Sequence, residues 1–385
     1  MAFGRKNHVN LDPLSYSICL LGESKVGKSS TIYHMCEKLV GDDGYMFMEL
    51  GDERGADAIE DINYINCPEW EMDEYDEYTN SHGFSNVCDD IIQNKSTEYP
   101  NLRVVIWDTY DQLILLAEKE AIRLWNKECK ATNNHDKVTK SINAAWGGFG
   151  KGEKKAIELM FDYKKRLKKV GVETIVIGHV KTKDVTDVVS GETYQTLTSD
   201  QQQNYFNALK KQLHFLGLAY IDRNIKTEKT GKKNIVTKKE ETKNVVVDEK
   251  RKIKFRDDNY AVDSGSRFAD IVPEINLDAD ELIKAITDAI KAEQSKSNKS
   301  LEETKKEQDY AREQREEEIA QMLKAEKEKK DLETINEEIY QFIVDKKDDK
   351  TAILPILKAL KEHGLTSPKD ITDMSLAKDI LKLTK

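Results

Sequence analysis

The chain has 385 residues, of which 34% are charged, and a formal net charge of −10. This length accommodates one large hydrophobic core and a smaller module, because single cores seldom exceed about 250–300 residues. The excess of acid excludes a protein that coats nucleic acid through bulk charge, so any site for a polyanion must be local. The sequence has no apolar run near the roughly 20 residues of a membrane span. Its start has no apolar signal core, so we expect a cytoplasmic protein that does not bind a membrane.

The first predicted strand, residues 16–21, leads into a glycine-rich loop and then a helical pattern. The loop matches G-x-x-x-x-G-K-[ST] between a strand and a helix, the context that this phosphate-binding motif requires. Gly22 and Gly27 are expected to let the backbone turn, so that N–H groups converge on phosphate oxygens at the helix N-terminus. We expect Lys28 to reach the β- and γ-phosphates and Ser29 to ligate Mg²⁺. The predicted site for ATP and Mg²⁺ consists of Gly22, Glu23, Ser24, Lys25, Val26, Gly27, Lys28, Ser29 and Ser30.

A second predicted strand, residues 45–50, ends in a group of acids. A carboxylate near the γ-phosphate is able to orient the attacking water. We expect Asp52 or Glu53 to take this role, and not Glu49, because Glu49 should lie within the strand. Ordinary turn acids are the alternative interpretation for each of them.

Asp108 ends the third predicted strand, residues 103–108. Acids at the carboxyl ends of parallel strands lie at the ligand-binding edge of the sheet. Asp108 is therefore expected to hold the water shell of Mg²⁺, as a Walker B carboxylate does. The next residue is Thr109, so no glutamate directly follows. The alternative is an aspartate that caps a turn.

Helical patterns at 113–128 and 154–169 flank the glycine-rich stretch 141–152. This stretch contains Trp146, Phe149 and Lys151, and aromatic rings beside a cation suit stacking on unpaired bases. A connector whose rings pack against the protein is an equally favoured interpretation.

The fourth predicted strand, residues 173–179, ends at His179. A polar side chain at this position is able to sense the γ-phosphate and to pass its state to residues 181–200, although a core histidine remains the alternative. A helix is predicted over 205–217, with Gly217 as its C-cap, before a fifth strand at 218–222.

Beyond residue 223 the composition changes. Residues 226–256 contain 12 Lys/Arg and 5 Asp/Glu, a local net charge of +7, and 244–255 alternate like an antiparallel hairpin. A helix should start near Asp278–Asp280. We divide the chain into a core of residues 1–290, a charged helical linker of 291–332 and an all-helical module of 333–385, a possible site for a protein partner. Within the module, Gly364 should end one helix and Ser367-Pro368 should open the next.

Several segments resemble RecA-type ATPases. The stretches LLGESKVGKSS, VVIWDTYDQL and IVIGHVKTK are similar to the P-loop, Walker B strand and sensor strand of that family. A closer resemblance, to the phage-encoded RecA-like nucleotide-binding proteins associated with single-strand annealing and recombination, covers roughly residues 14–290. It rests on INAAWGGFGKG, ETYQTLTSDQQQNYFNALKKQLHFLGLAYIDR and DDNYAVDSGSRFADIVPEINLDADELIKAI.

The resemblance implies roles for particular residues. Lys28 and Ser29 would contact phosphate and Mg²⁺, Asp108 would be the Walker B acid, and His179 would be the sensor. The hydrolytic acid would follow the second strand, which fits Asp52 or Glu53. RecA-type proteins also complete the site with cations of a neighbouring subunit. By position in the chain the candidates are Arg267, Lys254 and Arg256, and surface cations of a basic hairpin are the alternative interpretation for each. A phage protein would work in the host cytoplasm.

The resulting expectation is an α/β protein with a RecA-like core, a mostly parallel sheet, a charged helical linker and a small helical C-terminal module. We expect a DNA-dependent ATPase that assembles into a ring or filament on single-stranded DNA. The alternative is a nucleotide-gated scaffold that recruits a recombination or replication protein. A small-molecule phosphotransferase is less favoured, because no Arg-rich lid segment is evident.

Overall fold

The structure is a computed structural model that falls into two compact units, Met1–Arg312 and Glu313–Lys385. The residues it describes are 8–186, 191–233, 240–256, 264–297, 299–347 and 349–384.

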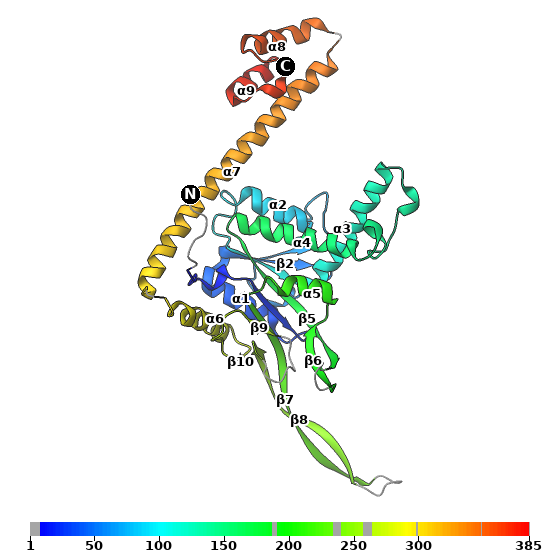
Figure 1. The fold of residues 1–385 in the computed structure, drawn as a ribbon, viewed down its shortest axis with the longest axis vertical. Coiled ribbons are helices and arrows are strands. Elements are labelled where there is room, and N and C mark those ends of the chain that lie inside the picture. Colours follow the sequence, from blue (N-terminus) through cyan, green and yellow to red (C-terminus); the bar gives the residue numbers. More distant parts are fainter. Residues whose placement is uncertain are drawn as a thin grey trace. The chain divides into compact units, whose positions relative to one another are not determined.

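A mixed, largely parallel sheet forms the centre of the first unit (Figure 1). The parallel strands are β1 (Ile18–Gly22), β2 (Tyr45–Leu50), β3 (Tyr64–Cys67), β4 (Val104–Asp108), β5 (Glu173–Thr186) and β7 (Phe215–Lys233). The antiparallel strands are β6 (Thr193–Ser199), β8 (Glu240–Lys254), β9 (Gly265–Ser266) and β10 (Glu274–Asn276). The order is β10-β8-β7-β1-β5-β4-β2-β3, with β6 paired to β5 and β9 to β7. The expected α/β fold is thereby confirmed at this level.

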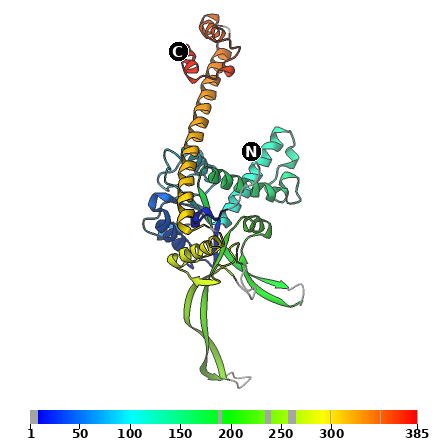
Figure 2. The same ribbon diagram turned by 60° about the vertical axis from the view of Figure 1, so that its left-hand side comes forward.

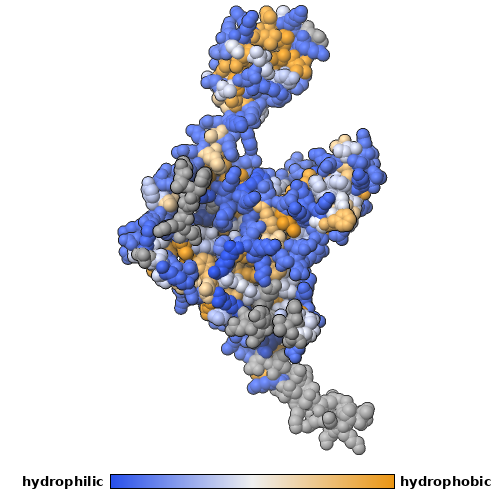
Figure 3. Space-filling model, viewed as in Figure 1, coloured by the Kyte–Doolittle hydropathy of each residue, from blue (hydrophilic) through white to orange (hydrophobic). Residues whose placement is uncertain are grey.

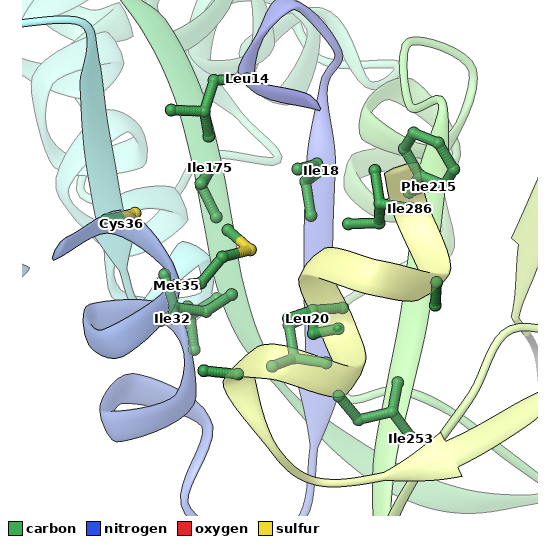
Figure 4. Close-up of a cluster of buried hydrophobic side chains, with 14 of the residues drawn as sticks. Leu14, Ile18, Leu20, Ile32, Met35, Cys36, Ile175, Phe215, Ile253 and Ile286 are labelled. Atoms are coloured by element: carbon green, nitrogen blue, oxygen red, sulfur yellow. The ribbon is translucent and has the colours of Figure 1, made fainter. Parts of the chain in front are cut away.

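Alternating strand residues separate the two faces of the sheet. Ile18, Leu20 and Ile175 share a core with α1 (Lys28–Val40) and α6 (Ala279–Gln294), as Figure 4 shows. On the opposite face Trp107 contacts Phe84, with ring centroids 5.6 Å apart. The helices on that face are α2 (Phe84–Asn94), α3 (Tyr110–Ala131), α4 (Lys151–Lys169) and α5 (Gln203–Lys210).

The helix predicted over 205–217 is only partly correct. Helix α5 ends at Lys210, and Phe215–Gly217 belong to β7. A short apolar run fits a buried strand as well as a helix, so periodicity alone did not separate them. Gly217 is not a cap: a Cβ there would lie 2.9 Å from Cγ2 of Ile253, so its role is to let β8 approach closely.

Strands β7 and β8 continue beyond the sheet as a two-stranded antiparallel ribbon (Figures 1 and 2). The hairpin predicted within 244–255 is therefore wrong, because Glu240–Lys254 is a single strand. Alternation is the same in one strand of a ribbon as in a hairpin, and Asp248-Glu249-Lys250 lacks the glycine or asparagine of a tight turn. Residues 234–239 of the basic tract lie outside the described residues.

Helix α6 starts as predicted: Asp278 is its N-cap and accepts hydrogen bonds from the N–H groups of Asp280 and Glu281. Helix α7 (Leu301–Asp345) is continuous across residue 333, where the linker was expected to give way to the module.

The second unit has its own small core, in which α7 packs with α8 (Lys350–Glu362) and α9 (Met374–Lys382). Gly364 follows α8 with a φ of +71°, as predicted. Ser367 caps a 3-10 turn, Pro368–Asp370, whereas α9 begins later, after Asp373. Among the described residues, no helix combines the length and apolar character needed to cross a membrane.

Candidate nucleotide-binding site

The predicted phosphate loop, residues 22–29, runs from the end of β1 to the start of α1 at the carboxyl edge of the parallel strands. Helix α1 begins at Lys28, and its N-cap Gly27 has a φ of +110°, a conformation that glycine adopts without strain. Gly22 does not supply a turn, contrary to expectation. It lies in β1, and a Cβ there would be 2.7 Å from the carbonyl oxygen of Ala219, so this glycine is required by close packing against β7.

The Lys28 side chain folds back into the loop. Its ammonium donates hydrogen bonds to the carbonyl oxygens of Gly22 (3.1 Å) and Glu23 (2.9 Å). Burial lowers the pKa of Lys28, while the nearby charges of Asp108 and Asp111 oppose that shift. The cation is thus held among backbone carbonyls inside the loop.

Ser29 and Asp108 meet at the centre of the site. The Ser29 hydroxyl donates a hydrogen bond of 2.6 Å to Oδ2 of Asp108, which is only 5% exposed. Burial raises the pKa of Asp108 to about 6, and the bond from Ser29 and the charge of Lys28 counteract it. The structure therefore brings together the two residues that the sequence assigned to Mg²⁺.

Glu49 is the residue that sequence reasoning discounted. It is the register partner of Asp108 on the neighbouring strand, and it is 1% exposed. Its Oε1 accepts a hydrogen bond from the N–H of Ala56, whereas its buried Oε2 has no partner among the described residues. Burial raises the pKa of Glu49 to about 7. Its place in the strand is as predicted, but the register of β2 with β4 brings the side chain into the site.

Gly55 lies close to Glu49, Ser29 and Asp108. A Cβ at Gly55 would lie 3.5 Å from Oε1 of Glu49, 3.6 Å from Oγ of Ser29 and 3.9 Å from Oδ2 of Asp108. Gly55 therefore faces all three oxygen atoms at once.

The two favoured acids differ in placement. Glu53 is half-buried, and its charge raises the pKa of Asp108 and of His179, so it lies within electrostatic reach of the site. Asp52 is exposed to solvent. The geometry favours Glu53 over Asp52, and it adds Glu49.

His179 lies on β5, the strand between β1 and β4, and is the register partner of Gly22. Its backbone N–H donates to Oδ2 of Asp111 (2.8 Å), and its Nδ1 lies 2.9 Å from the same oxygen. This hydrogen bond to Asp111 raises the pKa of the imidazole. His179 thus lies beside the phosphate loop in a polar network, and not in the hydrophobic core.

Arg251, on β8, is a site residue that sequence reasoning missed. Its guanidinium donates a hydrogen bond of 3.2 Å to the carbonyl of Val26 in the phosphate loop. Arg223, on β7, lies 3.8 Å from Glu23 of the same loop. Arg251 is one of 12 lysine and arginine residues in the tract 226–256, and Arg223 lies just before that tract, so nothing in the sequence marks either residue.

The three candidates for a cation supplied to a neighbouring subunit make contacts within their own chain. Arg267 lies beside β9 at the amino edge of the sheet, opposite the phosphate loop, and donates to the carbonyl of Lys211. Arg256 donates to the carbonyl of Phe268 (3.1 Å), and the Lys254 ammonium lies 5.8 Å from the ring centroid of Tyr220. Their role in a neighbouring site stays a prediction.

The stretch 141–152 presents its aromatic residues unequally. Trp146 is half-buried: its indole N–H donates to the carbonyl of Ala121 (3.0 Å) and its ring lies 5.6 Å from that of Trp125. Phe149 is 100% exposed, and Lys151 is the exposed first residue of α4. Trp146 therefore packs against the protein, as in a structural connector, whereas the Phe149 ring is exposed, as stacking on a base would require.

Comparison with models of known protein families gives no match. No curated protein matches the chain either.

Proposed function

We propose that this protein is a RecA-like ATPase that acts on single-stranded DNA in recombination, annealing or replication. The observation that carries the proposal is the 2.6 Å contact between Ser29 and Asp108, made beside the folded-in ammonium of Lys28. The resemblance to phage-encoded RecA-like proteins supports it, and would place the protein in the cytoplasm of a host cell.

The residues present fit a nucleoside triphosphate with Mg²⁺. The loop supplies backbone N–H groups at the start of α1, Lys28 supplies the cation, and Ser29 and Asp108 supply oxygen atoms for the metal. A bound Mg²⁺ would neutralise charge that develops on the transferred phosphate. The buried Oε2 of Glu49 has no partner among the described residues, so it is an acceptor that a ligand or water would satisfy.

Glu49 is the residue that we favour for orienting the attacking water, with Glu53 as the second candidate. A general base works best with a pKa near the working pH, and that of Glu49 is about 7. Its hydrogen bond to the N–H of Ala56 fixes the carboxylate in place.

Two neighbouring segments, the β5–β6 hairpin and the stretch 141–152, would couple the nucleotide site to DNA. The β5–β6 hairpin begins beside His179, since the N–H of Asp200 donates to the His179 carbonyl (3.0 Å). Asn204 of α5 donates to Glu153 in the first turn of α4 (2.8 Å), which brings the stretch 141–152 beside the segment that follows β6. Residues 187–190 of the predicted 181–200 loop lie outside the described residues. Trp146, Phe149, Lys151 and the basic β7–β8 ribbon would supply the contacts to DNA.

Assembly into a ring or filament would complete the site with a cation from the next subunit. ATP at such an interface would stabilise the oligomer by mass action. Arg267, Lys254 and Arg256 remain the candidates for that cation.

A nucleotide-gated scaffold is the second candidate, and one observation favours it. The second unit has its own core yet leaves Leu354 65% and Leu357 42% exposed on α8. Figure 3 shows apolar residues on the visible face of this unit. Such residues would suit a protein partner whose binding follows nucleotide state.

Steady-state ATP hydrolysis, with and without single-stranded DNA across a salt series, tests the proposal. We expect stimulation that fades as salt rises, because phosphate contacts release counterions. Lys28→Ala should abolish turnover. ATP hydrolysis that does not change with DNA would favour the nucleotide-gated scaffold. Wild-type protein that does not hydrolyse ATP would contradict the proposed ATPase activity.

A further inference from the structure

A cavity of about 330 Å³ lies beside the phosphate loop, between α1 and the start of α6. Ser30, His34 and Lys38 line it from α1, and Leu277 and Asp278 line it from the segment that opens α6. Its volume is within the range of roughly 300–1,000 Å³ that is typical of small-molecule sites.

The α1 wall of the cavity starts where the phosphate loop ends. Residues 30, 34 and 38 are four apart, so they form one stripe along the helix. At a rise of about 1.5 Å per residue, the stripe extends about 12 Å from Ser30. Ser30 directly follows Ser29, so the cavity continues from the end of the phosphate site along the helix.

The opposite wall touches the loop itself. A Cβ at Gly27 would lie 3.4 Å from Cδ2 of Leu277, which is van der Waals contact. At the far end, Lys38 forms an ion pair of 2.7 Å with Asp280 of α6. One end of the cavity thus adjoins the phosphate loop, and at the other end the Lys38–Asp280 ion pair joins α1 to α6.

The chemistry of the walls differs from that of the loop. His34 offers an imidazole ring whose side chain is 51% exposed. Asp278 uses Oδ1 to cap α6, and a carboxylate accepts more hydrogen bonds than the two made there. A carboxylate disfavours further phosphate but accepts hydrogen bonds from sugar hydroxyls and base amino groups.

We propose that this cavity holds the sugar and base of the nucleotide whose phosphates bind residues 22–29. The inference rests on the proposed function and adds to it the residues that recognise the nucleoside. His34 provides a surface on which the base stacks, and Asp278 provides an acceptor for its hydroxyl or amino donors. Affinity for a nucleotide therefore exceeds affinity for the bare phosphate chain.

Equilibrium binding to the full-length protein tests this inference without reference to turnover. Isothermal titration calorimetry with ADP and with inorganic pyrophosphate, which has the same two phosphates but no sugar or base, is carried out on wild type and His34→Ala. The matched control is Glu37→Ala, which removes the carboxylate 3.4 Å from His34 but no lining residue. Alanine is a good helix former, so both variants should keep α1 intact.

We expect His34→Ala to lower the affinity for ADP about tenfold, within the range for base–aromatic stacking, and to leave the affinity for pyrophosphate unchanged. Glu37→Ala should change neither affinity. Equal affinity of both ligands for wild type, or a His34→Ala variant that binds ADP as wild type does, would place the nucleoside elsewhere. A variant that loses both ligands alike would show a role at the phosphates and overturn the inference. A wild-type protein that binds neither ligand would instead refute the nucleotide site as a whole.

Discussion

Arg251 of β8 is hydrogen-bonded to the carbonyl of Val26, with 3.2 Å between the guanidinium nitrogen and the oxygen. Val26 is fully buried in the phosphate loop, and β8 continues into the ribbon that it forms with β7. One side chain therefore connects the loop that would hold phosphate to the strand that would contact DNA.

Replacing Arg251 with alanine should raise the KM for ATP roughly three- to tenfold, because a hydrogen bond at this exposed position stabilises the loop by about 0.7–1.4 kcal/mol. Steady-state kinetics measures the change. Lys250→Ala is the matched control, since it removes an exposed neighbouring cation of the same strand. An equal effect of both substitutions would assign the change to lost charge and not to the contact with Val26.

Alanine substitution should affect DNA binding at Phe149 and the stability of the fold at Trp146. Phe149→Ala should leave thermal stability within about 0.5 kcal/mol of wild type, because its side chain is 100% exposed. The same substitution should weaken single-stranded DNA binding about fivefold or more if the ring stacks on a base.

Trp146→Ala should instead destabilise the protein by about 1–3 kcal/mol, since it removes the hydrogen bond to Ala121 and the contact with Trp125. Thermal unfolding and fluorescence anisotropy with a labelled oligonucleotide separate the two effects. Unchanged DNA affinity in Phe149→Ala would remove the stacking hypothesis.

Glu49→Gln should stabilise the nucleotide-free protein above pH 7 while it abolishes turnover. In the folded state the pKa of Glu49 is about 7, against an ordinary value of 4.5. Between these values the folded state binds more protons than the unfolded state, so the wild type loses stability as pH rises through this window. Glutamine keeps the acceptor for Ala56 and does not ionise.

The expected gain in melting temperature is a few degrees at pH 8 and diminishes towards pH 5. Thermal unfolding at several pH values measures it. A gain that is independent of pH would mean that the charge on Glu49 does not cause it. Retained turnover would transfer the role of orienting water to Glu53.

Asp108→Asn should remove the dependence of nucleotide affinity on Mg²⁺. The carboxylate is joined to Ser29, and the amide that replaces it is a poor ligand for Mg²⁺. Titration of ADP with Mg²⁺ and with EDTA measures the dependence. Lys28→Ala provides the contrast, because it should lower the affinity for ADP both with Mg²⁺ and with EDTA. A full Mg²⁺ effect in Asp108→Asn would exclude this residue from the metal site.

The sequence was sufficient where a local pattern has a single structural solution. The strand–loop–helix arrangement of residues 18–40 and the strand end at Asp108 follow from motif and context, and the structure brings Lys28, Ser29 and Asp108 together. The sequence was insufficient where a residue reaches the site only through the pairing of strands that are far apart in the chain. Glu49 enters the site through the register of β2 with β4, and Arg251 through the pairing of β8 with β7. Neither pairing is visible in local composition.

Strand β5 runs without interruption from Glu173 to Thr186, and His179 is at its middle. The half before His179 is fixed between β1 and β4, and the half after it pairs only with β6 among the described strands. Because the two halves belong to one continuous strand, a small rotation of β5 near His179 would produce a larger displacement at the far end of the β5–β6 hairpin. A tilt of His179 towards or away from a phosphate would therefore need no hinge to reposition the β5–β6 hairpin.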